Sequence, residues 1–471
     1  MKILLNMLSI EVAGFWSFLE RYQLRPAMGL LMLTAVLRDA GYEVEMADQR
    51  VERFDLEQWI ERIVKNQYDI VGLSTYSTTR PHHAHYISSL RKKYKGLIIV
   101  GGPAVMKDSV DFWLDSGADI AVLGEGERTL LEIIERMESG KSIEGVAGTV
   151  VRNSKNETVW GPSRDFLTIQ ELEALPYPAW NSYWIREYTD HTIINAQLPT
   201  AGMITTRGCP YRCAFCGSPN FWKGVRQRSV ENVMGEIDWL VKNFRIRHIG
   251  FLDDIFGLKT KWVLDFCDQL KSRPYQLNWM ICTHPLSFGT RRPEVYRAMA
   301  EAGLNFISFG AQSANPRVLE NINRNPKEIE ALRENIPLCR ELGIATTLTY
   351  IFGLPGDTPE TADKAIRFVL DVKPTVADFH PLWYFQGSEL GDKYPNCDAT
   401  PYSFEDHKSW SRKARQKFYL NPSIIFQFAK YILQHNPRYI GTLLRLMWDA
   451  FPEYVFEQKK GIKWESGDQR T

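Results

Sequence analysis

Short apolar runs alternate with amphipathic segments along the first 150 residues. The segments between the runs carry apolar residues at helical spacing, and Gly41 and Gly140 stand where helix C-terminal caps belong. Strands separated by helices pair in parallel through right-handed crossovers, so the pattern predicts a doubly wound parallel sheet of five strands, flavodoxin-like in fold. The expected strands are 2–6, 42–48, 69–75, 97–102 and 119–124, and the expected helices are 28–41, 56–66, 82–94 and 129–140.

The alternation stops at residue 141 and resumes at 201. Between them lie an expected hairpin (148–161) and a stretch rich in proline and aromatic residues. Six βα units then predict a partial (β/α)6 barrel of the TIM type, open where eight units would close it. Its strands are expected near 203–206, 247–252, 278–282, 306–311, 345–351 and 377–383.

These changes of pattern divide the chain into four parts. The α/β sheet domain occupies residues 1–145, a linker 146–200, the barrel 201–395, and a C-terminal helical domain 396–471. The last part is basic and aromatic, with Arg412, Lys413, Arg415 and Lys417 among Trp410, Phe418 and Tyr419. A capping bundle with a solvated basic face is favoured over a wall of the substrate cavity or a dock for an anionic or lipid-like substrate.

Composition excludes some classes of function. Lys plus Arg number 57 against 56 Asp plus Glu, so no bulk charge favours nucleic acid. No run approaches the roughly 20 apolar residues of a transmembrane helix. The apolar start MKILLNMLSI is followed by Glu11, and no small-residue cleavage site appears after it. This pattern indicates a first strand instead of a signal peptide. With an odd count of seven cysteines, a cytoplasmic location is expected.

Three of the seven cysteines fall within eight positions, as Cys209, Cys213 and Cys216 in GCPYRCAFC. A closed structural zinc site needs four ligands, and no partner pair follows downstream. Cys267, Cys282, Cys339 and Cys397 stand singly in helix or strand patterns, where a cysteine is most often a small buried apolar residue. Three thiolates on a four-iron, four-sulfur cluster leave one iron free for a small molecule. A structural zinc loop is the alternative.

The cysteine loop and its flanks resemble the radical S-adenosylmethionine (SAM) superfamily, in which this spacing holds a [4Fe-4S] cluster whose open iron binds SAM. The resemblance implies that SAM is reduced to a 5′-deoxyadenosyl radical, with the electron coming from a donor such as flavodoxin or ferredoxin. Phe215, before the third cysteine, also matches the family.

Further barrel segments resemble the superfamily's SAM contacts. Asp253 and Asp254 end the strand HIGFLDD, where relatives contact the SAM amino group, and two solvated acids are the alternative. Gln312 and Ser313 occupy the segment usually written G-x-E-S, where glutamine can hydrogen-bond but brings no charge. Gly353 lies in the turn GLPGDT, which packs by the adenine in relatives and which a tight turn alone would also explain.

The front domain alone could be any flavodoxin-like module, and such sheets bind ligands at the carboxyl ends of their strands. Three loops stand at these strand ends, STYSTTR (74–80), GGPAV (101–105) and LGEGE (123–127). Their order before the cysteine loop resembles the cobalamin (B12)-binding domain of the B12-dependent branch of the superfamily, and the linker's LPYPAW (175–180) also resembles the segment that joins the two domains there. The resemblance covers residues 1 to about 390. It implies cobalamin contacts at three loops: Ser74, Thr75 and Thr78; Gly101, Gly102 and Pro103; Gly124, Glu125 and Gly126.

His82, His83 and His85 invite a cobalt site, because imidazole binds cobalt. The D-x-H-x-x-G motif of base-off cobalamin proteins is absent. Pro81 fits a first helical turn, so exposed histidines without a ligand role are expected on that helix.

The function that follows is a B12-dependent radical SAM methyltransferase that methylates an unactivated carbon of a small molecule, apolar or ring-bearing. A cyclase, ring-contraction or oxidation enzyme with the same cofactors is the alternative, and a non-catalytic cobalamin or iron–sulfur sensor is a remote one. No residue is assigned to the chemistry beyond the cofactor contacts, and the substrate stays open.

Overall fold

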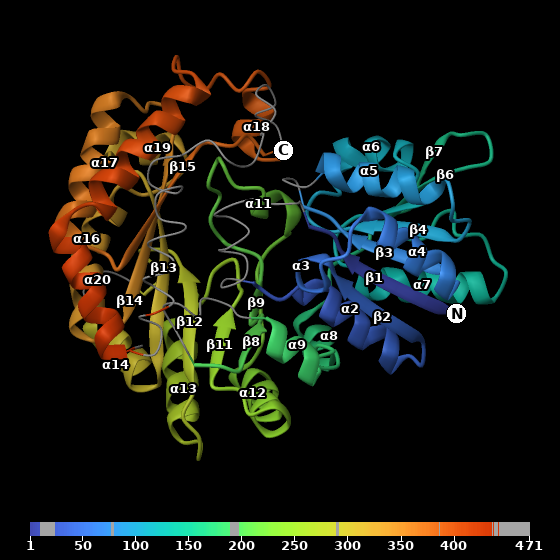
Figure 1. Cartoon of the computed structure of the whole chain (residues 1–471), viewed down its shortest axis with the longest axis horizontal. Coiled ribbons are helices and arrows are strands. Elements are labelled where there is room, and N and C mark those ends of the chain that lie inside the picture. Colours follow the sequence, from blue (N-terminus) through green and yellow to red (C-terminus); the bar gives the residue numbers. More distant parts are fainter. Residues whose placement is uncertain are drawn as a thin grey trace.

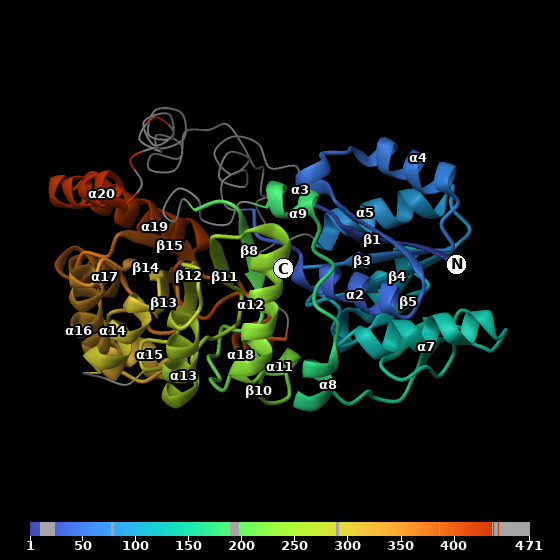
Figure 2. The same cartoon turned by 90° about the horizontal axis from the view of Figure 1, so that it is seen from below.

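The computed structural model describes residues 1–9, 24–76, 80–188, 197–288, 292–385 and 387–435, together with residues 437 and 441. Figure 1 shows an N-terminal α/β domain beside a larger domain built on a curved sheet. The turned view of Figure 2 keeps the two domains side by side, with the linker running between them.

The N-terminal sheet has the strand order β2-β1-β3-β4-β5-β6-β7. Its first five strands are parallel: β1 (Lys2–Met7), β2 (Glu43–Asp48), β3 (Ile70–Ser74), β4 (Leu97–Gly101) and β5 (Ile120–Val122). The five predicted strands are therefore present. The hairpin that the sequence assigned to the linker forms β6 (Thr149–Arg152) and β7 (Thr158–Trp160), which extend the sheet with two antiparallel strands.

Alternate residues of these strands face two separate helix layers. Ile3 and Leu5 of β1 pack on the side of α2 (Met28–Asp39) and α7 (Glu127–Glu138). Leu4 packs on the other side, against α4 (Leu56–Asn66), α5 (Arg80–Arg91) and α6 (Val110–Asp115). Both faces are buried, which explains why the parallel strands read as continuous apolar runs.

The second domain carries six parallel strands in the order β8-β11-β12-β13-β14-β15. They are β8 (Thr200–Met203), β11 (His248–Phe251), β12 (Asn278–Thr283), β13 (Leu304–Gln312), β14 (Ala345–Phe352) and β15 (Val376–Pro381). The outer helices are α12 (Val230–Phe244), α13 (Thr260–Lys271), α14 (Pro293–Glu301), α16 (Lys327–Glu341) and α17 (Pro359–Val372). The predicted (β/α)6 partial barrel is confirmed.

The first barrel strand lies earlier than predicted. It ends at Met203, and residues Thr206–Arg207 form β9, which pairs antiparallel with β10 (Arg226–Gln227). The cysteine loop and the short helix α11 (Ser218–Phe221) lie between β9 and β10, so this two-stranded ribbon closes the base of the loop.

The linker is ordered where the structure describes it. It carries α8 (Ile169–Ala174), capped by Thr168, and α9 (Ser182–Glu187), capped by Asn181. Trp180 and Trp184 are buried in the same hydrophobic core as α2 and the first barrel strands. The two domains therefore share one continuous core across the linker.

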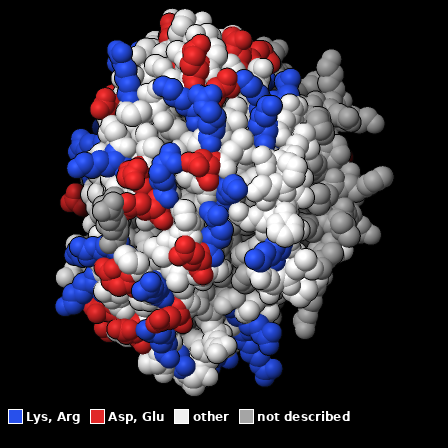
Figure 3. Space-filling view, turned by 90° about the vertical axis from the view of Figure 1, so that its left-hand side faces the viewer, with Lys and Arg blue, Asp and Glu red and all other residues white. Residues whose placement is uncertain are grey.

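The C-terminal part adds α18 (Glu389–Lys393), α19 (Phe404–Tyr419) and α20 (Pro422–His435). Helix α19 lies along the edge strand β15, where the Tyr419 hydroxyl donates to the carbonyl of Ala377 (2.9 Å) and Arg415 donates to the carbonyl of Phe379 (3.1 Å). Lys413 is exposed and pairs with Asp363 at 2.6 Å. The face seen in Figure 3 intersperses cations and acids. Lys413 and Lys417 are exposed, as the predicted solvated basic face requires, but Arg415 is buried against β15 and does not belong to that face.

Candidate functional site

A cavity of about 670 Å³ lies between the two domains. The carboxyl ends of β3, β4 and β5 contribute three predicted loops, through Ser74, Gly101–Pro103 and Gly124–Gly126. The barrel contributes residues 204–208, Gly217 and Asp254. The three sheet loops and the flanks of the cysteine loop, up to 143 residues apart in the chain, thus meet around one space.

Two of the glycines that line this cavity leave little room for a side chain, and Gly102 also has a backbone conformation that favours glycine. Gly102 has a φ of +100°, and a Cβ there would lie 2.8 Å from the carbonyl oxygen of Thr75. A Cβ on Gly126 would lie 3.2 Å from the Leu33 side chain. The bare backbone leaves room for a large ligand to approach the strand ends, as the cobalamin prediction requires.

The three hydroxyl residues predicted in the first loop do not all line the cavity. Ser74 lines the cavity, whereas Thr75 is buried behind it and donates from Oγ1 to the carbonyl of Gly101 at 2.9 Å. Thr78 lies outside the described residues. Met28, Met32, Leu33 and Leu130 add apolar wall from α2 and α7. An apolar wall with a narrow polar rim suits a broad macrocycle whose edge carries amide groups.

The three cysteine side chains are free thiols, each partly buried. A tight turn holds the loop, since the Cys216 amide donates to the carbonyl of Cys213 at 3.0 Å. Burial, together with the neighbouring Cys213, Asp254 and Cys216, raises the pKa of Cys209 to about 11, against the lowering effect of a backbone hydrogen bond from Tyr211. Thiols so placed stay protonated in the free protein and lose their protons to a metal group, as cluster ligands do.

The cysteine loop is compatible with a multi-iron group. In the described part of the chain, no three His, Cys, Asp or Glu side chains are grouped to hold one metal ion. A four-iron cluster asks for something different, because each cysteine binds its own iron. Three partly buried thiols on one loop satisfy that demand.

A charged group near the cysteine loop was not predicted from the sequence. Arg324 donates to the carbonyl of Gly310 (2.7 Å) and to Glu328 (2.8 Å). Burial raises the pKa of Cys213, and the Arg324 guanidinium opposes that rise. A cation beside the cysteines stabilises negative charge on a bound cluster. Only the fold reveals this, because 111 positions separate Cys213 from Arg324 in the chain.

Glu328, the partner of Arg324, also connects through His284 to Tyr211, which lies between the first two cysteines. The ring of Tyr211 stacks on His284 with centroids 3.8 Å apart and planes at 12°. Nε2 of His284 lies 3.1 Å from Oε1 of Glu328. Burial lowers the pKa of His284, although Glu328 opposes this. Tyr211, the aromatic residue in CPYRC, therefore stacks on a buried histidine that lies against Glu328.

The two predicted acids after β11 have different surroundings. Asp253 is buried and accepts three hydrogen bonds, from the Thr205 amide (2.6 Å), the Thr206 amide (2.8 Å) and the Thr205 hydroxyl (2.6 Å). It therefore holds the segment that leads into the cysteine loop. Asp254 is exposed, lines the cavity and accepts from the Ser218 hydroxyl at 2.7 Å.

The remaining predicted SAM residues lie at the ends of β13 and β14. Gln312 has a φ of +62°, rare for a residue with a side chain, and its buried Oε1 has no hydrogen-bond partner among the described residues. Ser313 accepts from the Asn315 amide at 3.2 Å. Gly353 has a φ of +95°, and a Cβ there would lie 2.3 Å from His407. A buried amide oxygen of this kind suits a ligand's hydrogen-bond donor.

Phe215 packs partly buried in a small cluster with Leu319 and Leu390, away from the interdomain cavity. Of the isolated cysteines, Cys267 and Cys339 are fully buried as predicted, while Cys282 and Cys397 are partly buried.

The expectation that the histidines at 82, 83 and 85 are all exposed is wrong. His83 is fully buried instead of exposed, with Nε2 3.3 Å from the carbonyl oxygen of Leu8. The cause is that α5 begins at Arg80 and turns this position onto the sheet. Burial lowers the pKa of His83 to about 4. His82 is partly buried against Tyr86, and His85 is exposed. None of the three is among the described residues that line the cavity.

In the part of the chain that the structure describes, none of the helices combines the length and hydrophobicity needed to cross a bilayer.

Comparison with known proteins places both domains. Residues 203–369 match the family model of the radical SAM superfamily, and residues 19–134 match that of the B12 binding domain. The predicted class, a radical SAM enzyme with a B12-binding domain, is confirmed.

Relatives in sequence and structure align with most of the chain. An uncharacterized methyltransferase of Pyrococcus horikoshii is 26% identical over 454 residues, 90% of this chain and 95% of that protein. An anaerobic magnesium-protoporphyrin IX monomethyl ester cyclase of Rubrivivax gelatinosus is 27% identical, over 84% and 70% of the two chains. The radical SAM methyltransferase TsrM of Kitasatospora setae, solved with cobalamin and a [4Fe-4S] cluster, superposes with a TM-score of 0.68 at 20% identity, over 84% and 75%. At that identity the superposition shows the fold.

Proposed function

Because the chain joins a B12-binding domain to a domain of the radical SAM superfamily, we propose that it is a cobalamin-dependent C-methyltransferase acting on a small molecule. The observation that carries the proposal is the single cavity lined by the strand ends of the front sheet and by the flanks of the cysteine loop. Two proposed cofactor sites that open into one space would be the arrangement that methylation of an unactivated carbon requires.

Cys209, Cys213 and Cys216 would hold three irons of the cluster and leave the fourth for SAM. Ser74 and the glycine loops at 101–102 and 124–126 would hold cobalamin against the methionines of α2. When bound, the cluster with SAM supplies a hydrogen-abstracting 5′-deoxyadenosyl radical and cobalamin supplies the methyl group.

The protein's own residues orient these groups and exclude water. Asp254 and Gln312, the first exposed at the cavity and the second buried with a free amide oxygen, are the polar side chains proposed to contact SAM, with Ser313 and Gly353 beside them. The apolar walls from α2 and α7 keep the space dry, which protects a reactive carbon radical from side reactions. A flavodoxin or ferredoxin is proposed as the electron donor.

A cyclase or oxidation enzyme with the same cofactors is the second candidate, because the magnesium-protoporphyrin cyclase is as similar in sequence as the methyltransferase. In such an enzyme cobalamin handles electrons, and no methyl group is transferred.

One assay separates these functions without the substrate. The anaerobic holoprotein, loaded with iron, sulfide and hydroxocobalamin, is reduced with titanium(III) citrate and given SAM. A methyltransferase forms methylcobalamin and S-adenosylhomocysteine, and slowly releases 5′-deoxyadenosine. Release of 5′-deoxyadenosine without methylcobalamin would favour the second candidate. Absence of any SAM cleavage by a cluster-loaded protein would overturn both.

A further inference from the structure

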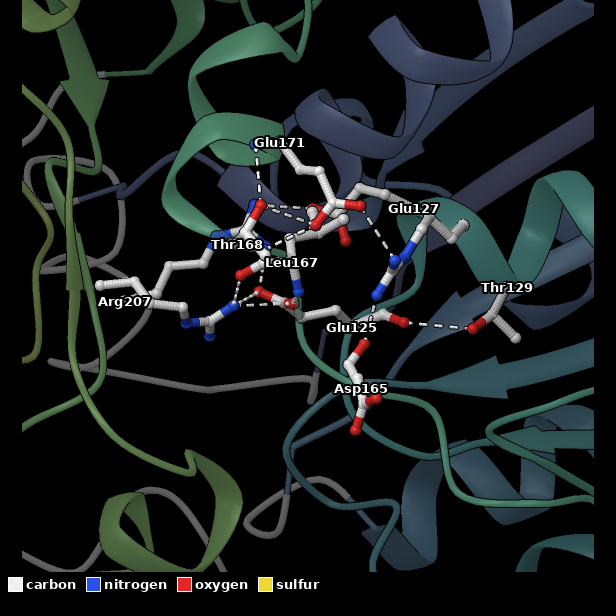
Figure 4. A network of polar contacts seen from close by, with 10 residues as sticks. Glu125, Glu127, Thr129, Asp165, Leu167, Thr168, Glu171 and Arg207 are labelled. Atoms are coloured by element: carbon white, nitrogen blue, oxygen red, sulfur yellow. Dashed lines mark hydrogen bonds and ion pairs between the residues drawn. The ribbon is translucent and has the colours of Figure 1, made fainter.

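Four charged side chains join the two domains at the edge of the cavity, and we call them the interdomain clamp: Glu125 and Glu127 of the front domain, and Arg207 and Arg226 of the barrel. Figure 4 shows Glu125 and Arg207 pointing toward each other from their separate domains. Arg207 bridges both acids, reaching Glu125 at 2.6 Å and Glu127 at 2.6 Å. Arg226 reaches both oxygens of Glu125 at 2.9 Å.

The clamp is buried and balanced in charge. The four side chains are between 6% and 14% exposed, so water screens their interaction little. The Leu167 amide gives Glu125 a further donor at 2.6 Å, and the Arg226 guanidinium lies 4.8 Å from the Phe166 ring. Removing one member of such a set leaves a buried charge unpaired, which is far more costly than losing a surface ion pair.

The clamp also connects the two loops that matter for the cofactors. Glu125 lies between Gly124 and Gly126 in the loop after β5, and all three line the cavity. Arg207 ends β9, two residues before Cys209, and its partner in the ribbon is Arg226. Any displacement of the Glu125 loop is therefore transmitted by side-chain contacts to the strand that leads into the cysteine loop.

We propose that Glu125 and Arg207 are positioning residues that fix the B12-binding loop relative to the cysteine loop, so that cobalamin binding and the surroundings of the cluster are energetically coupled. This rests on the proposed function only in that cobalamin occupies the cavity. Coupling of this kind is reciprocal: breaking the clamp weakens cobalamin binding and also alters the magnetic interaction between cobalt and cluster.

The test uses the full-length anaerobic protein, with and without its cluster, and hydroxocobalamin as the probe. Arg207→Met and Glu125→Gln each remove one side of the clamp, Arg207→Lys keeps the charge, and Glu125→Gln/Arg207→Met completes a double-mutant cycle. The control is Arg128→Met. Arg128 follows Glu127 directly in the sequence, but it pairs with Glu171 of the linker at 3.0 Å on the surface and not with the barrel.

We expect Arg207→Met and Glu125→Gln each to weaken hydroxocobalamin binding by about tenfold, with the double variant no worse than the single ones. Arg207→Lys recovers part of the affinity, and Arg128→Met stays within about twofold of wild type. In the reduced holoprotein, the electron paramagnetic relaxation of cob(II)alamin caused by the cluster changes in the first two variants and not in the control.

Several outcomes would overturn the inference. Unchanged affinity and relaxation in Arg207→Met and Glu125→Gln would show that the clamp positions nothing. Additive losses in the double variant would show that the two residues act independently. A wild-type protein that binds no hydroxocobalamin would instead refute the proposed function, and the inference with it. If Arg207→Met does not fold, Glu127→Gln removes one arm of the clamp and is measured in its place.

Discussion

At the scale of single residues, the three cysteines differ from the other four by their neighbours. Cys209, Cys213 and Cys216 share one loop above Arg324, whereas Cys267 lies fully buried in the hydrophobic core. We expect Cys213→Ala to abolish cluster incorporation, because one iron loses its only protein ligand. Cys267→Ala is the matched control. It removes only a buried sulfur, costs about 1 kcal/mol of stability and leaves the iron content unchanged. Iron and sulfide analysis with visible absorption checks both.

Because His83 is buried, we expect the stability of the folded protein to depend on pH. Its folded-state pKa, lowered by burial to about 4, lies below the ordinary value of 6.5. The unfolded chain therefore takes up a proton before the folded chain does, so stability is full above pH 6.5 and is lost as the pH falls toward 4. The expected loss is up to about 3 kcal/mol.

The measurement is urea unfolding between pH 7 and pH 4.5. His83→Gln keeps a donor for the carbonyl of Leu8 and should reduce the pH dependence, leaving the part that comes from His407, whose pKa burial also lowers to about 4. Substitution of the exposed His85 by Gln should leave the dependence as in wild type. An equal pH slope in wild type and His83→Gln would contradict the assignment of this dependence to His83.

At the scale of elements, the β9–β10 ribbon depends on Gly208. This residue has a φ of +93°, and a Cβ there would lie 2.3 Å from the carbonyl oxygen of Gly224. Gly208→Ala should therefore open the ribbon beneath the cysteine loop, costing about 2 kcal/mol or more and lowering the iron content of the reconstituted protein. Gly217→Ala is the control, because a Cβ at Gly217, directly after Cys216, meets nothing within 4 Å. Equal iron contents in the two variants would refute this role for the ribbon.

Long helices and most of the strands were predictable from the sequence, and the two-residue strands β9 and β10 were not. Helix α4 was placed at its observed bounds, because apolar spacing over three turns is an unambiguous signal. Two-residue strands such as β9 and β10 have no period to detect, and their pairing joins Arg207 to Arg226 across the cysteine loop. The hairpin of β6 and β7 was recognised, but its attachment to β5 is a long-range contact that local pattern does not encode.

The residues of the candidate site also differ in how far they could be predicted from the sequence. Cysteines and glycines that stand together in short motifs could be proposed as site residues, because their chemistry depends on local spacing. Arg207, Arg226 and Arg324 were missed, since a lone arginine is most often a solvated surface residue and acquires its role from distant partners. Asp253 shows the limit most clearly: its position was foreseen, but three hydrogen bonds give it a structural task.

At the scale of the whole molecule, the two domains share one hydrophobic core. Leu31 of α2 and Trp184 of the linker belong to the same cluster as Met203 at the end of β8. The Leu31 carbonyl also accepts from the Ala179 amide of the linker at 3.0 Å. A core shared in this way, with the interdomain clamp at its edge, couples the stability of each domain to that of the other.

We therefore expect the holoprotein to lose its helical circular dichroism and its cluster absorption in one thermal transition. Leu31→Ala, fully buried on the shared face, should lower both midpoints together by about 2–5 °C, from a core cost of about 2–5 kcal/mol spread over a chain of this size. Two separate transitions in wild type, or a shift in the circular dichroism midpoint alone, would contradict the coupling. The cluster reports on the barrel and Leu31 lies in the front domain, so a joint shift can arise only if the domains unfold together.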